Sequence, residues 1–119
     1  MYEPHGFKFI KIVNDDATVV KLFAYWRGGY CGSDAWRLNS GCTKIISLDE
    51  GMIDAHTGEP ISNEYYEVHG ESGSVYKIRN SEGLAPSNYI VDVFNKIMKG
   101  GDATIITLKE AITLINKEV

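Results

Sequence analysis

The stretch "GFKFIKIVNDDATVVKLFAYWR", residues 6–27, decides the fold of this chain. Two runs rich in β-branched and aromatic residues flank "NDDA", whose Asn and Asp side chains suit a short turn. The stretch therefore predicts a β-hairpin. Its alternation is imperfect, because Phe7 and Phe9 fall on one face while Ile10 and Ile12 fall on the other. This pattern predicts either a bulge or strands that are covered on both faces.

Four shorter segments further along also have the composition of strands. "AWRL" (35–38) and "TKIISL" (43–48) predict two strands that the turn signal "NSG" separates. "EYYEVHG" (64–70) and "SVYKIRN" (74–80) predict a second hairpin across "ESG". Since most of these strands follow one another across short turns, the predicted sheet is mostly antiparallel.

The spacing of apolar residues changes to that of a helix in "APSNYIVDVFNKIMKGG", residues 85–101. Its apolar side chains recur at i, i+3, i+4 and i+7, which is typical of an amphipathic helix. Pro86 lies near the expected start, and Gly100 lies just beyond the expected end. The segment therefore predicts a helix with one face turned toward the core.

The last part of the chain predicts a short strand and a second helix. "DATIITL" (102–108) is the strand, and Thr107 with Glu110 three positions later forms a capping box. The apolar face of this helix comprises Ala111, Ile112, Leu114 and Ile115. The whole chain, residues 1–119, thus predicts one α+β domain. We expect a mostly antiparallel sheet of about five to seven strands, with the two helices of the C-terminal half packed on one face.

The composition is typical of a soluble globular domain. The chain has 119 residues, of which 44% are hydrophobic and 24% are charged. Its first residues show no basic leader, and no apolar run approaches the roughly 18 residues of a membrane helix. We therefore expect a cytoplasmic protein without membrane association. In that compartment Cys31 and Cys42 are expected to be reduced thiols.

Acidic residues are concentrated in the middle of the chain, and the formal net charge is −4. Between Ile45 and Tyr76 there are seven acids and no lysine or arginine. This distribution disfavours direct binding to a nucleic acid. It favours solubility or a protein partner with a basic surface, and the expected contacts are Glu64, Glu67 and Glu71.

A cysteine lies in the densest run of the chain, "GGYCGSDAWRLNSGC" at residues 28–42. The run resembles the signature around the papain-type catalytic cysteine, but Asp and Ala stand between Ser33 and Trp36 where that family has one Cys. A nucleophilic Cys31 would need a base, for which His69 is the best placed of the three histidines. A small cysteine-dependent hydrolase or thiol enzyme is the alternative to a structural cysteine.

Aromatic and arginine residues surround the same glycines, in a composition used in protein interfaces and base stacking. Packing in the core is the other reading, because strand aromatics mostly fill cores. The expected partner-binding residues in this segment are Tyr25, Trp26, Arg27, Tyr30, Trp36 and Arg37.

Two carboxylate and imidazole pairs could belong to a metal site. Asp54 with His56, and Glu67 with His69, are spaced at i and i+2, so each pair shares a face in an extended segment. Such nitrogen and oxygen ligands suit zinc or a similar ion. Surface residues without a metal are the other interpretation, and no cofactor is expected.

Two phrases, "WRLNSG" (36–41) and "HGESGSVYKIRN" (69–80), resemble segments of small uncharacterised bacteriophage or prophage proteins. The resemblance implies a phage accessory protein that acts by binding, and it assigns no catalytic residue. The sequence thus predicts a small cytoplasmic binding protein that acts on another protein. The oligomeric state is left open.

Overall fold

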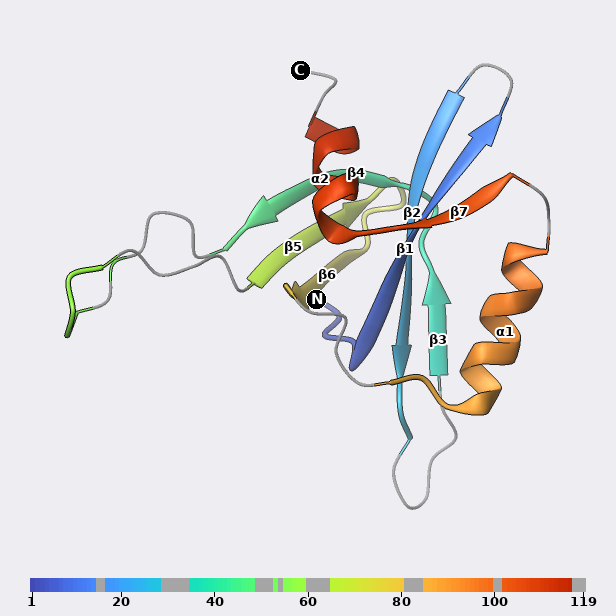
Figure 1. Ribbon diagram of the computed structural model, residues 1–119, viewed down its shortest axis with the longest axis horizontal. Coiled ribbons are helices and arrows are strands. Elements are labelled where there is room, and N and C mark those ends of the chain that lie inside the picture. Colours follow the sequence, from blue (N-terminus) through green and yellow to red (C-terminus); the bar gives the residue numbers. More distant parts are fainter. Residues whose placement is uncertain are drawn as a thin grey trace.

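The computed structural model describes residues 1–14, 17–28, 35–48, 53, 55–59, 65–80, 85–99 and 102–116. Strands β1 (Gly6–Asn14) and β2 (Ala17–Trp26) form the hairpin that the sequence predicts. Strand β3 (Ala35–Leu38) pairs with β2, and β7 (Ala103–Ile106) pairs with β1. These strands make a four-stranded antiparallel sheet in the order β3-β2-β1-β7 (Figure 1).

The second sheet has the order β4-β5-β6, with β4 at Cys42–Ser47, β5 at Tyr65–Gly70 and β6 at Val75–Arg79. Its strands are also antiparallel. The predicted α+β class and antiparallel pairing are confirmed, and the described residues hold seven strands. They divide between two sheets, however, where the sequence was expected to form one.

The two sheets and two helices enclose two apolar clusters. The inter-sheet core is buried between the sheets beneath α2 (Leu108–Asn116), and the α1-side core lies beneath α1 (Asn88–Met98). The inter-sheet core comprises Phe7, Phe9, Val20, Leu22, Ala24, Ile45, Val68, Tyr76, Ile78, Ile106 and Ala111. The α1-side core comprises Ile10, Phe23, Tyr25, Ile90 and Phe94.

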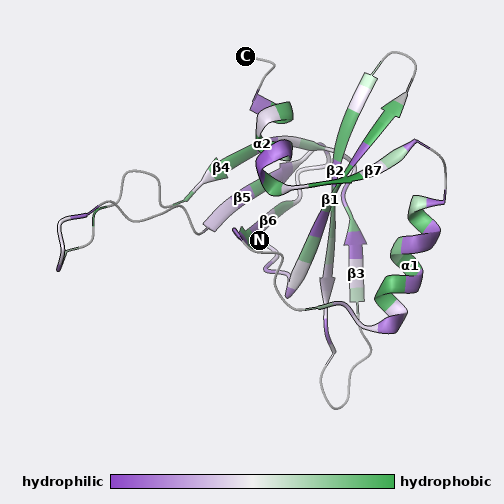
Figure 2. Cartoon of the chain, viewed as in Figure 1, coloured by the Kyte–Doolittle hydropathy of each residue, from purple (hydrophilic) through white to green (hydrophobic). Residues whose placement is uncertain are grey.

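The hairpin β1–β2 contributes to both clusters, so its strands are covered on both faces. Phe7 and Phe9 enter the inter-sheet core, whereas Ile10 enters the α1-side core. Figure 2 shows β1 and β2 as largely hydrophobic and α1 with alternating polar and apolar patches. The helices therefore lie against opposite faces of the hairpin, and the predicted packing of both on one face is corrected. The physical reason is that neither apolar face can be left in water.

Local capping sets where each helix begins. Ser87 is the N-cap of α1, and its hydroxyl accepts a hydrogen bond from the Ile90 amide at 3.3 Å. At α2 the Glu110 amide donates to Thr107 Oγ1 at 3.1 Å, while the Thr107 amide donates back to Glu110 Oε1 at 3.3 Å. The predicted capping box is therefore confirmed.

The chain passes from the first sheet to the second at Asn39. This side chain is only 4% exposed. Its Oδ1 accepts from the Leu22 backbone amide at 2.8 Å, and the Asn39 backbone amide donates to the Leu22 carbonyl at 3.1 Å. The "NSG" segment is thus a crossing between sheets, where the sequence suggested a turn between neighbouring strands. Gly41 lies two residues later and has a φ of 150°, a backbone conformation that residues other than glycine rarely adopt.

Replacing Asn39 with Ala should lower the free energy of unfolding by about 1–3 kcal/mol, because it leaves the buried Leu22 amide without its acceptor. The control is Ser40→Ala, which removes an exposed acceptor of the Ser72 amide at 3.1 Å. Urea unfolding of both variants measures the difference. An equal loss in the two variants would show that the Asn39 side chain does not hold the crossing.

Replacing Phe94 with Ala should cost about 3–5 kcal/mol, because it opens a cavity in the α1-side core. Phe94 is buried, and its ring meets Phe23 edge to face with centroids 5.2 Å apart. The control on the same helix is Tyr89→Ala, since Tyr89 is exposed. A Phe94 variant no less stable than this control would show that α1 does not cover the sheet.

Candidate functional site

The exposed edge of the first sheet is formed by β3, and no described strand pairs with its other side. Trp36 and Arg37 are adjacent on this strand, so they point to opposite faces. Trp36 is 38% exposed, and its ring stacks on Phe23 with centroids 5.8 Å apart. A large aromatic side chain is thereby held rigidly at the surface.

Arg37 is exposed on the opposite face of β3 and is fixed by two tyrosines. Its guanidinium carbon lies 4.4 Å from the centroid of the Tyr2 ring, and its Nε donates to the Tyr76 hydroxyl at 3.3 Å. This hydrogen bond is the main cause that raises the pKa of Arg37. The Tyr2 ring stacks on Tyr76 at 5.2 Å and meets Trp26 edge to face at 6.1 Å. We call Tyr2, Trp26, Arg37 and Tyr76 the arginine–aromatic cluster.

The other residues expected in this segment have different surroundings. Tyr25 is 2% exposed and belongs to the α1-side core, because it shares the strand face of Phe23. It is therefore a core residue and not part of a partner surface. Trp26 is half-buried, and its indole Nε1 donates to the Glu3 carbonyl at 3.0 Å. Arg27 is exposed. Tyr30 lies outside the described residues.

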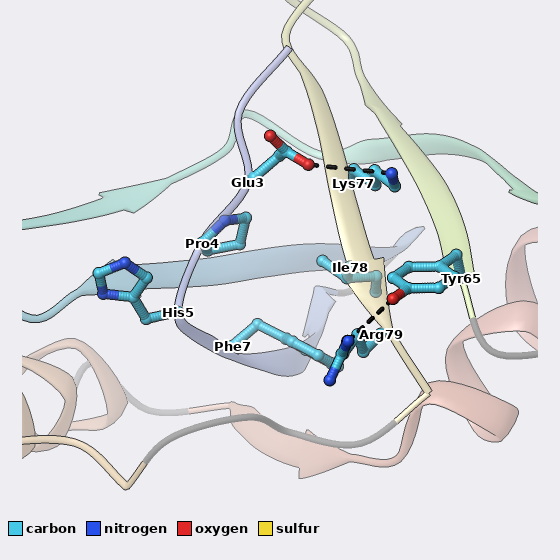
Figure 3. Close-up of a pocket in the computed structure, with 8 residues that line it drawn as sticks. All are labelled: Glu3, Pro4, His5, Phe7, Tyr65, Lys77, Ile78 and Arg79. Carbon is cyan, nitrogen blue, oxygen red and sulfur yellow. Dashed lines mark hydrogen bonds and ion pairs between the residues drawn. The ribbon is translucent and has the colours of Figure 1, made fainter.

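A pocket of about 280 Å³ opens between the N-terminal segment and the second sheet (Figure 3). It is lined by Glu3, Pro4, His5, Phe7, Tyr65, Lys77, Ile78 and Arg79. Sequence reasoning missed this pocket. The sequence shows that Lys77 and Arg79 are two positions apart in a predicted strand. Their proximity to residues 3–7, however, depends on a contact between distant parts of the chain.

Glu67 and His69 share the outer face of β5, as their spacing predicts. His69 Nε2 donates to Glu67 Oε1 at 2.6 Å. Among the described residues, no group of three or more His, Cys, Asp or Glu side chains is placed to hold a metal. His56 is exposed, and its expected partner Asp54 lies outside the described part of the chain.

The acidic residues expected to bind a partner are placed unevenly. Glu71 is exposed in the turn between β5 and β6, where its backbone amide donates to the Gly41 carbonyl at 2.9 Å. Glu67 is half-buried and hydrogen-bonded to His69. Glu64 is not among the described residues. Of the two glutamates that the structure describes here, Glu71 is therefore more exposed to solvent than Glu67.

Of the two cysteines, Cys42 lies within the described residues. Cys31, the candidate nucleophile, lies outside the described residues, so its distance from His69 is not defined. Cys42 is a free, half-buried thiol, and its Sγ accepts a hydrogen bond from Asn39 Nδ2 at 3.3 Å. Burial raises the pKa of Cys42 to about 11, although the hydrogen bond from Asn39 acts in the opposite direction. Cys42 is therefore a poor nucleophile at neutral pH.

No protein-family profile, curated protein or solved structure matches this chain. Within the described residues, no helix is both long and apolar enough to cross a membrane. The segments that resemble phage proteins, 36–41 and 69–80, meet where the Ser72 amide donates to Ser40 Oγ at 3.1 Å. A phage origin stays a prediction.

In a Cys31→Ser variant, Cys42 should react with iodoacetamide at pH 7.4 at least about a hundredfold more slowly than free glutathione, because so little of it is thiolate. Mass spectrometry of the alkylated protein over time measures the rate. The control is the same variant in guanidinium chloride, where the thiol should react at the ordinary rate. Equal native and denatured rates would contradict the burial of this thiol.

The raised pKa of Cys42 also predicts how the free energy of unfolding depends on pH. An unfolded thiol loses its proton near pH 8.5–9, whereas native Cys42 keeps it to about pH 11. Between these values the native state binds more protons than the unfolded state, so this residue's contribution to stability falls as pH rises. In the Cys42→Ala variant that part of the decline should be absent.

Proposed function

We propose that this chain is a protein-binding domain whose contact surface is the β3 edge with Trp36 and Arg37. The proposal is supported by one observation above all: both side chains are exposed, yet each is already held by aromatic rings. Tryptophan and arginine are the residue types that most often dominate the energy of protein interfaces. Side chains that are already ordered lose little conformational entropy when a partner binds.

The geometry of β3 adds a backbone contribution to this surface. Its outer edge pairs with no described strand, and we propose that an extended segment of a partner adds a strand there. The strand has only four residues, and Arg37 places a charge on it. A short, charged edge resists self-association and leaves recognition to a partner with complementary side chains.

The partner that we propose has a basic surface. The net charge of −4 and the exposed carboxylates of Glu59 and Glu71 support attraction of such a partner at long range. Trp36 and Arg37 would then make the close contacts. We propose the cytoplasm as the compartment, where a reducing environment keeps a free thiol such as Cys42 reduced.

Replacing Trp36 with Ala should lower capture of the partner by at least about tenfold, and Arg37→Gln should have a similar effect, because both remove pre-ordered contacts. Immobilised protein is incubated with lysate of the cells that express it, and retained proteins are quantified by mass spectrometry. The matched controls are Tyr89→Ala for the aromatic ring and Lys44→Gln for the charge, since both residues are exposed outside the β3 edge.

Thermal unfolding of each variant shows that it is folded before the comparison is made. The specific partner is the protein that the wild type and both controls retain, and its capture should weaken as salt is raised. Equal capture by the β3 variants, or no saturable partner for the wild type, would contradict the proposed function. A Cys31 that alkylates faster than free glutathione would instead favour the thiol enzyme.

A further inference from the structure

A second pocket lies on the α1 side of the first sheet, between the helix and the strands beneath it. Its volume is about 220 Å³. The residues that line it come from β1, β2, β7 and α1, together with Pro86, which precedes the helix. We call it the helix-side pocket. Four segments that are far apart in the sequence therefore enclose one small space.

Strand register explains which side chains form the floor of the helix-side pocket. Phe23 and Tyr25 are two positions apart on β2 and both belong to the α1-side core. Lys8 is the register partner of Phe23. Ile105 is the register partner of Ile10, which belongs to the same core. Because directly opposite residues of an antiparallel pair share a face, all the floor residues lie on the face that α1 covers.

One flank of α1 forms the wall. Ile90 and Phe94 are four positions apart, as are Val91 and Asn95, so the two pairs form adjacent rows along the helix. Ile90 and Phe94 are buried, whereas Val91 is 37% exposed and Asn95 is exposed. Ile105, which also lines the pocket, is 49% exposed. Val91, Asn95 and Ile105 therefore mark the mouth, and the buried rings lie deeper.

Gly6 leaves space beneath the helix. It is the register partner of Tyr25, and a Cβ atom at Gly6 would lie 2.4 Å from the tyrosine ring. The ring of Tyr25 therefore covers the bare backbone of β1 at this point. The rings of Phe23 and Phe94 meet edge to face with centroids 5.2 Å apart. Aromatic rings thus bound the pocket on the sheet and on the helix, and burial in the core holds them in place.

The chemistry of the lining favours a neutral, apolar ligand. Lys8 is the one charged side chain among the lining residues, and none of them is acidic, so a cation would meet only repulsion. A strongly hydrated ligand would lose water against walls that are mostly apolar. Val91 and Ile105 expose apolar surface to water at the mouth. A ligand that covers this surface removes it from water, which is favourable.

We propose that the helix-side pocket binds a small neutral molecule with two fused aromatic rings, such as an indole. An apolar cavity of roughly 150 Å³ is large enough for benzene, so about 220 Å³ leaves room for a further ring. The aromatic lining favours edge contacts with an aromatic ligand. Neither Trp36 nor Arg37 lines the pocket, so this site and the β3 edge can fail independently.

Titration with indole, followed by amide NMR, tests the proposal, and imidazole and benzoate are the comparison ligands. We expect saturable binding of indole with a Kd at or below about 1 mM, which is ordinary affinity for a ligand of this size. Imidazole and benzoate should bind at least about tenfold more weakly, because they lose more hydration on entering an apolar site. Shifts should concentrate at residues 90–95 and at Ile105.

Two variants at the mouth locate the site. Val91→Ser and Ile105→Ser should each weaken indole binding at least about threefold, because each removes apolar contact area. The matched control is Val13→Ser, since Val13 is 44% exposed but does not line the pocket. Thermal unfolding shows that each variant is folded. Should Ile105→Ser fail to fold, Val91→Ser decides, because it changes an exposed position of the helix.

Four results would overturn the assignment. Indole that does not saturate the protein by about 10 mM would remove the site. An equal loss in Val13→Ser and Val91→Ser would show general adsorption to apolar surface. Benzoate or imidazole that binds as tightly as indole would show that the pocket does not select a neutral aromatic molecule. A dimer in analytical ultracentrifugation that indole dissociates would assign the pocket to a side chain of a second copy.

Discussion

The two hydrogen bonds that Asn39 exchanges with Leu22 fix the point at which the chain leaves the first sheet. The side-chain oxygen takes the place of a backbone carbonyl, so the Leu22 amide stays satisfied although β3 has ended. Because this amide is buried, a path of the chain that moved the Asn39 side chain away would leave it without this acceptor. The end of β3 and the start of β4 both follow from this one residue, and so does the short edge that presents Trp36 and Arg37.

The second sheet is tied to the first by polar contacts of aromatic residues as well as by the inter-sheet core. Tyr2 adds to the edge of β6, and Arg37 of the first sheet donates to the Tyr76 hydroxyl of the second. Trp26 also holds the N-terminal segment, through its hydrogen bond to the Glu3 carbonyl. The same segment therefore supports Arg37, through the ring of Tyr2, and closes one side of the pocket in Figure 3.

Local signals allowed most of the elements to be predicted. The turn residues of the hairpin, the apolar stripe of α1 and the capping box at Thr107 and Glu110 each act within a few positions, and each element formed where expected. The division into two sheets depends on Asn39 and Leu22, which are 17 positions apart. The segment "NSG" has the same composition whether it joins paired strands or crosses between sheets, so the sequence did not distinguish these outcomes.

Strand register also explains why a linear run of acids differs from an acidic surface. Between Ile45 and Tyr76 the sequence has no lysine or arginine, yet the residues that bound this run are basic. In the second sheet Lys77 lies opposite Glu67, and Lys44 lies opposite His69. Pairing thus places Lys77 beside Glu67, the acidic residue of β5, and Lys44 beside the neighbouring His69. The charge at each point of a β-sheet surface is therefore set by which strands are neighbours, and the net charge of the chain does not determine it.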